Sequence, residues 1–103
     1  MPKISIIAKL TAAEGKSEAL ERAIRDVVAA ASEEPGLEVY SAHASDDEPG
    51  IYYFFEIYRD ADANEQHGKG EGMRAAMGAF AGLLAARPEV ITMTPIVDKG
   101  LNL

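Results

Sequence analysis

Apolar and polar residues alternate along four segments of the chain, which is the pattern of β-strands that bury one face. The predicted strands span residues 4–10, 37–45, 51–58 and 89–98. The third is the strongest prediction, because it consists of β-branched and aromatic residues on both faces. Such a strand is expected to be covered on both sides. Pro95 cannot donate to a neighbouring strand, so the last strand is predicted to lie at a sheet edge or to bend near its end.

Two further segments repeat their apolar residues at helical spacing. The first predicted helix spans residues 16–32 and ends before a Pro-Gly pair, which favours a turn. The second spans residues 73–84. Before it, residues 60–67 are predicted to form a short helical turn, and the glycine-rich residues 68–72 a mobile lid or a plain loop.

The predicted element order is β-α-β-β-α-β, which is the ferredoxin-like α+β arrangement with an antiparallel sheet, in a single domain over residues 1–103. Two helices can cover only one face of a four-stranded sheet. The pattern nevertheless makes the other face apolar, above all in the third strand. Exposed apolar patches of that size are typical of association surfaces. We therefore expect a homodimer in which two sheets pack face to face.

The composition narrows the classes of partner and compartment. A net charge of −7, spread along the chain, disfavours nucleic acid and anionic membrane surfaces as partners. With no cysteine, the chain has no disulfide, thiolate nucleophile or cysteine metal site. No apolar run approaches the roughly 20 residues that span a bilayer, and residues 1–10 lack the apolar core of a signal peptide. A cytoplasmic protein is the expectation.

Several short motifs occur in a characteristic order along most of the chain. They are Ile-Ile-Ala-Lys…Gly-Lys-Ser-Glu at the start, Glu34-Pro35-Gly36 leading to Tyr40, Phe55-Glu56-Ile57-Tyr58 followed by Asp60, and then His67. In this order they resemble the antibiotic biosynthesis monooxygenase (ABM) superfamily. The resemblance implies a dimeric α+β barrel. It also implies one of several activities, since the superfamily includes cofactor-independent monooxygenases of quinol-like aromatics, haem degraders and a signal-processing isomerase.

The chain departs from this family at several positions. Gly72 and Met73 stand where members often carry a second histidine and a phenylalanine, and Tyr58 stands where tryptophan is common. The haem-degrading branch relies on a tryptophan and a first-strand asparagine. This chain has no tryptophan, and residues 3–10 contain no asparagine, so haem degradation is disfavoured.

His67 is the first candidate for chemistry. A histidine can act as a general base near neutral pH, and cofactor-free oxygenation requires removal of a proton from a phenol or enol. The alternative is structural: His67 would cap or hydrogen-bond the short helix and fix the neighbouring loop. Both interpretations stay open from the residues, and the resemblance adds weight to the first.

Glu56 is the second candidate, because it interrupts an otherwise aromatic strand face. A buried carboxylate without a partner costs several kcal/mol, so Glu56 must be paired or neutral. One interpretation is a proton acceptor or polar anchor beside a pocket. The other, which the residues favour, is a structural salt bridge or hydrogen bond across the dimer, to Arg59, Arg74 or a backbone amide.

Aromatic side chains and a second histidine could line a pocket between sheet and helices. The candidates are Tyr40, Tyr58, His43 and Phe80. The glycines at 78 and 82 around Phe80 suggest that another element or a ligand approaches this helix closely, since glycine within a helix costs about 1 kcal/mol relative to alanine. One glutamate and two separated histidines make a poor metal site, and we expect no metal.

Together these features suggest a cofactor-independent monooxygenase of a small aromatic or quinol-type compound, with His67 as proton acceptor and Glu56 as its polar partner. Two alternatives remain open. One is a dimeric module that binds a small hydrophobic ligand without turnover, or serves as an accessory protein. The other is an isomerase on the same fold.

Overall fold

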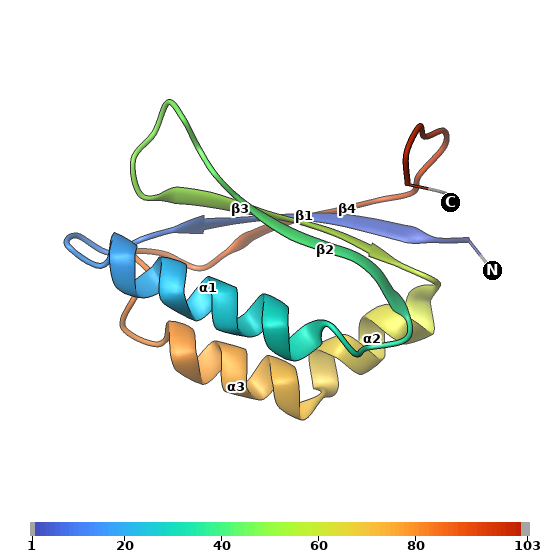
Figure 1. Cartoon of the computed structure of the whole chain (residues 1–103), viewed down its shortest axis with the longest axis horizontal. Coiled ribbons are helices and arrows are strands. Elements are labelled where there is room, and N and C mark those ends of the chain that lie inside the picture. The colour runs from blue at the N-terminus through green and yellow to red at the C-terminus, as the bar shows by residue number, and fades with distance from the viewer. Residues whose placement is uncertain (1, 102–103) are drawn as a thin grey trace.

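The computed structural model describes residues 2–101, with side chains for all of these except residues 68, 69 and 71–73. Figure 1 shows a single sheet with α1, α2 and α3 together on one side of it. The elements are, in chain order, β1 (Ile4–Thr11), α1 (Ser17–Ala31), β2 (Leu37–Ala44), β3 (Ile51–Tyr58), α2 (Ala61–Lys69), α3 (Glu71–Phe80) and β4 (Glu89–Met93).

The sheet has the strand order β2-β3-β1-β4, and each neighbouring pair is antiparallel. This order and the element sequence confirm the predicted ferredoxin-like α+β fold. The sheet edges are β2 and β4. β4 is an edge strand, as Pro95 predicted, and it ends at Met93, two residues before this proline. The strand is shorter than the predicted span of residues 89–98.

The main core lies between the sheet and the helices. Its buried side chains come from β1, α1, β3 and α3: Ala8, Leu10, Leu20, Ala23, Ile24, Val27, Tyr52, Phe54, Ala76 and Phe80. The apolar face of α1 supplies five buried positions along its length, as the helical spacing predicted. A smaller cluster at the other end of the sheet contains Ile6, Tyr58 and Ala63, the last from α2.

The structure corrects two predictions about the second half of the chain. Residues 68–72 do not form a loop or lid, because α2 continues to Lys69 and α3 begins at Glu71. The chain changes direction at Gly70, whose backbone is extended. Nor does a neighbour approach Gly78, since no described atom lies within 4 Å of the position its β-carbon would take. Gly82 lies beyond the helix and has a φ of +78°, so it serves the turn that follows α3.

Candidate active site

Glu56 and Tyr58 lie on the helix-facing side of β3 and are hydrogen-bonded to each other. The Tyr58 hydroxyl donates to Oε1 of Glu56 at 2.5 Å. Glu56 is 8% exposed and Tyr58 is fully buried. Residues two apart on a strand share a face, so strand alternation alone brings the two side chains together. Glu56 is therefore paired as expected, but with a phenol and not with Arg59, Arg74 or a backbone amide.

The protonation of this pair follows from its burial. Burial raises the pKa of Glu56 above its ordinary value, and nearby Glu34 adds to the rise, while the Tyr58 hydrogen bond and His67 oppose it. Burial and the Glu56 carboxylate also raise the pKa of the Tyr58 phenol. The pKa of Tyr40 is raised by burial, then by Glu56 and Glu34. Both phenols thus stay neutral, and Glu56 keeps its proton to a higher pH than an exposed glutamate does.

His67 lies beside these residues on α2 and is 7% exposed. Its ring contacts two tyrosine rings, each with a centroid separation of 5.5 Å: Tyr40 edge-on at 74° and Tyr58 tilted at 54°. Tyr40 belongs to β2 and pairs in register with Glu56 of β3. Three elements therefore bring His67, Tyr40, Tyr58 and Glu56 into one buried cluster, which we call the His67 cluster.

Glu34 completes the surroundings of the imidazole. Its Oε2 lies 2.7 Å from Nδ1 of His67. The Glu34 side chain is 32% exposed, against 6% for that of His67. The other ring nitrogen, Nε2, is buried and has no hydrogen-bond partner within the described part of the chain. Buried polar atoms in proteins are nearly always paired, so an unpartnered Nε2 points to an interaction that the folded chain alone does not supply.

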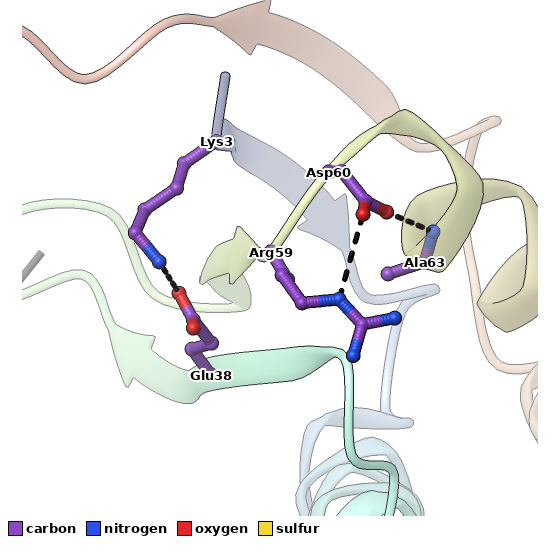
Figure 2. Close-up of polar contacts among 5 residues, drawn as sticks. All are labelled: Lys3, Glu38, Arg59, Asp60 and Ala63. Carbon is purple, nitrogen blue, oxygen red and sulfur yellow. Dashed lines mark hydrogen bonds and ion pairs between the residues drawn. The ribbon is translucent and has the colours of Figure 1, made fainter. Parts of the chain in front are cut away.

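The start of α2 fixes where His67 lies. Asp60 caps the helix by accepting a hydrogen bond from the Ala63 amide at 2.9 Å, and it also pairs with the Arg59 side chain (Figure 2). Gly36, in the turn before β2, lies directly against Ala63: a β-carbon added to Gly36 would lie 2.4 Å from Cβ of Ala63. The Arg59 amide donates to the Gly36 carbonyl at 2.8 Å. The turn that carries Glu34 is thereby packed onto the helix that carries His67.

An ion pair lies near this end of the sheet. Lys3 Nζ contacts Oε1 of Glu38, and Figure 2 shows the two side chains meeting near Arg59. Since β3 separates β1 from β2 in the sheet, this pair links the residue just before β1 to a strand that is not its neighbour. The β2 register also shifts here, between Leu37 and Val39. Both features help to hold the beginning of β2, which follows the turn that carries Glu34.

The remaining predicted pocket residues lie apart from His67. Phe80 is buried in the main core. His43 is exposed on β2, where Ser41 Oγ lies 2.9 Å from its Nε2. Because residues of one strand alternate between faces, His43 lies on the face opposite Tyr40 and the helices. His43 also borders a groove of about 560 Å³ between α1 and the β2 edge, and none of the residues of the His67 cluster lines it.

Neither a metal site nor a membrane-spanning helix is found among the described residues. They contain no group of three or more histidine, cysteine or acidic residues arranged to hold a metal ion. Among the same residues, no helix has the length and apolar character needed to cross a bilayer.

Glu34 is the site residue that sequence reasoning missed. The Glu-Pro-Gly motif was interpreted as a helix stop, and the glutamate was not assigned a contact. A signal was present, since the residue before a proline is restricted to extended backbone conformations, which limits where the Glu34 side chain can lie. What no local pattern could supply is the position of α2 relative to this turn, which depends on the close approach of Gly36 to Ala63.

Comparison with known proteins places the chain in a family. The antibiotic biosynthesis monooxygenase family model matches residues 3–79, and this range includes Glu34, Tyr40, Glu56, Tyr58 and His67. The chain belongs to this family. No curated protein matches the sequence.

Solved structures from several bacteria share the fold over nearly the whole chain. A Pseudomonas aeruginosa protein is 29% identical with a TM-score of 0.86, and the match covers 94% of this chain and 97% of that one. A Caulobacter crescentus protein, described as a candidate antibiotic biosynthesis monooxygenase, is 28% identical with a TM-score of 0.88 and covers 93% and 92%. A Shewanella oneidensis protein is 25% identical with a TM-score of 0.84, covering 91% of each chain. The ABM chain described here thus has a monooxygenase-type fold.

Proposed function

We propose that this ABM protein is a cofactor-independent monooxygenase of a small aromatic or quinol-type compound, and that His67 is its proton acceptor. The observation that carries the proposal is the buried, unpartnered Nε2 of His67, set beside the rings of Tyr40 and Tyr58. An imidazole nitrogen in this situation can accept a proton from a phenolic hydroxyl, and neutral imidazole is suited to this role near pH 7.

The proton step is simple. The phenolic O–H bond of the substrate breaks, the proton passes to Nε2, and the resulting imidazolium is stabilised by the Glu34 carboxylate on Nδ1. The electron pair stays on the substrate oxygen and makes the ring electron-rich. Tyr40 and Tyr58 form the aromatic surroundings of the ring, since offset or edge-on aromatic pairs add roughly 0.5–1.5 kcal/mol beyond burial. Glu56 is the polar partner that holds Tyr58 in place.

The overall reaction balances without a further reductant. A hydroquinone and dioxygen give a hydroxyquinone and water. Dioxygen adds to a ring carbon to give a bound hydroperoxide. The C–H bond of that carbon then breaks together with the O–O bond, so that one oxygen atom stays on the ring and the other leaves as water. Both electron pairs that reduce dioxygen come from the substrate, which is oxidised to the quinone. His67 returns its proton to the bound hydroperoxide as the O–O bond breaks and water leaves.

The test is oxygen uptake by the purified protein with a panel of hydroquinones, with His67→Ala and His43→Ala measured in parallel. Loss of the general base should lower turnover about 10²- to 10⁴-fold. His43 is the matched control, because it lies on the other sheet face and outside the His67 cluster. Uptake that is equal in wild type and His67→Ala, or that never exceeds the uncatalysed rate, would refute the proposal.

The same assay separates the two alternative functions. Ligand binding without turnover, unchanged by His67→Ala, would indicate a binding or accessory module. Product formation without oxygen uptake, but still dependent on His67, would indicate an isomerase.

We also propose that the protein is a homodimer through the sheet face that the helices leave open. By strand alternation this face carries Ile7, Val39, Tyr53 and Phe55, and on β4 Ile91 is 57% exposed. An apolar patch of this kind favours association. Light scattering at micromolar concentration should give twice the mass of one chain, and Phe55→Asp should give a monomer. A monomeric wild type would contradict the proposal.

A further inference from the structure

Nδ1 of His67 faces a carboxylate, and this contact determines what the other nitrogen can do. A carboxylate has no hydrogen to donate, so Nδ1 must carry the proton in the 2.7 Å contact with Glu34 Oε2. When Nδ1 carries the proton of a neutral imidazole, Nε2 holds a lone pair. The free histidine side chain favours the opposite tautomer, with its proton on Nε2. Glu34 therefore works against the intrinsic preference of the ring.

We propose that Glu34 is a positioning residue, whose carboxylate holds neutral His67 in the tautomer that leaves Nε2 free to accept the substrate proton. Three observations support the assignment. The contact is short, the His67 ring is buried, and Nε2 finds no partner among the described residues. If Nε2 carried the proton instead, the lone pair of Nδ1 would face the Glu34 carboxylate, and the hydrogen bond in this contact would be lost.

The backbone around Glu34 is arranged to keep this contact. The Glu34 amide donates to the Ala31 carbonyl at 3.1 Å, and the Glu34 carbonyl accepts from the Leu37 amide at 3.2 Å. Two residues after Glu34, Gly36 lies against Ala63, which is one helical turn before His67 on α2. The contact between Gly36 and Ala63 therefore fixes the turn that carries Glu34 against the helix that carries His67.

The catalytic meaning of this inference rests on the proposed function, but the tautomer can be measured without any substrate. The measurement is long-range ¹H–¹⁵N correlation NMR of the histidine rings at neutral pH. The chain has only two histidines, so His43 serves as an internal reference. The expected wild-type result is a neutral His67 with its proton on Nδ1. A proton on Nε2, or an imidazolium with both nitrogens protonated, would overturn the assignment.

Variants then test whether Glu34 is the cause. In Glu34→Ala, the proton is expected to move to Nε2 of His67, while Glu33→Ala, which alters the exposed neighbouring glutamate, should leave the tautomer unchanged. An unchanged tautomer in Glu34→Ala would overturn the role of Glu34. Should Glu34→Ala fail to fold, the wild-type spectrum still decides whether Nδ1 carries the proton.

Turnover provides the second measurement. Glu34→Ala should lower kcat roughly 10- to 100-fold with little change in KM, less than the loss in His67→Ala, because the base remains but in the wrong tautomer. A change in KM alone would contradict a positioning role. If wild type consumes no oxygen, the proposed function fails, while the NMR result stands or falls independently.

Discussion

Gly36 and Ala63 pack so closely that the turn before β2 and the first turn of α2 leave no room for a β-carbon between them. The hypothetical Cβ of residue 36 would lie 2.4 Å from Cβ of Ala63. Alanine has no rotamer that could move aside, so a side chain at position 36 must displace the helix. Since His67 lies one turn further along α2, a shift of the helix at this contact would also move His67.

Gly36→Ala should therefore destabilise the protein by about 1–3 kcal/mol, the usual cost of overpacking, and should reduce His67-dependent turnover. The control is Gly78→Ala in α3, where no described atom lies within 4 Å of the new carbon. That substitution should be neutral or stabilise by up to about 1 kcal/mol, because alanine favours helix over glycine. Urea denaturation of both variants measures the difference. Similar changes in both would show that the Gly36 contact is not tight.

Removal of the Tyr58 hydroxyl should lower the free energy of unfolding, because the carboxyl oxygen that accepts its hydrogen bond is buried. Tyr58→Phe leaves Oε1 of Glu56 without its donor, and we expect a loss of about 1–3 kcal/mol in the free energy of unfolding. Tyr52→Phe is the matched control, since the Tyr52 hydroxyl donates at 2.9 Å to Glu21, whose side chain is 48% exposed and can turn to water. The loss there should be smaller, at most about 1 kcal/mol. Equal losses in the two variants would mean that burial of Glu56 does not raise the cost of removing its hydrogen-bond donor.

The protonation of Glu56 should be visible as a pH dependence of stability. Because burial raises the pKa of Glu56 in the folded state, the folded protein holds this proton more tightly than the unfolded chain does. The stabilising contribution is fully present below the ordinary glutamate pKa. It is lost as the pH rises through the higher pKa of the folded state.

Glu56→Gln removes this titration and keeps an oxygen that can accept from Tyr58. The stability of the variant relative to wild type should therefore increase as the pH is raised from about 4 to 7. Urea denaturation at several pH values gives this difference, and the exposed Glu33→Gln is the control, whose difference should stay nearly flat. A Glu56→Gln difference that is constant, or that falls with pH, would show that the pKa of Glu56 is not raised.

The His67 cluster should select substrates by charge. Together with the adjacent Glu34, it presents two carboxyl groups, those of Glu34 and Glu56, and none of their described hydrogen bonds or ion pairs involves lysine or arginine. Like charges brought together in a binding site cost several kcal/mol. We expect hydroquinone to be preferred over 2,5-dihydroxybenzoate by tenfold or more in kcat/KM. The preference should narrow in Glu34→Gln, and equal rates for the two compounds in wild type would contradict it.

Much of this fold follows from local pattern. The β-branched and aromatic residues at 51–58 predicted β3 without error in its bounds, and they also predicted a face that helices do not cover. The spacing of apolar residues predicted α1 to within a residue at each end. These elements are predictable because a two- or 3.6-residue period leaves the same face buried over many positions. The junction between α2 and α3 was predicted wrongly, because five residues rich in glycine indicate a loop, whereas the folded chain needs only Gly70 to leave the helical conformation.

The candidate site was predictable in part, for a related reason. Glu56 and Tyr58 share a strand face, so their proximity is local and could be anticipated. His67 and Glu34 are 33 residues apart in the chain, and their contact depends on how α2 packs against the turn before β2. The positions of His43 and Phe80 likewise depend on which sheet face and which end of the core each occupies. Such positions depend on tertiary packing, which the residue pattern of a single segment does not predict.

The central claim is that Nε2 of His67 accepts a hydrogen bond, and then a proton, from a phenolic substrate. The most direct measurement is an oxygen-free titration of the ¹⁵N-labelled protein with hydroquinone, followed through the ring nitrogen resonances of both histidines. We expect the Nε2 resonance of His67 to shift in a saturable way, while Nδ1 of His67 and both nitrogens of His43 change little. Saturable binding that leaves Nε2 of His67 unmoved, or that shifts His43 instead, would contradict it.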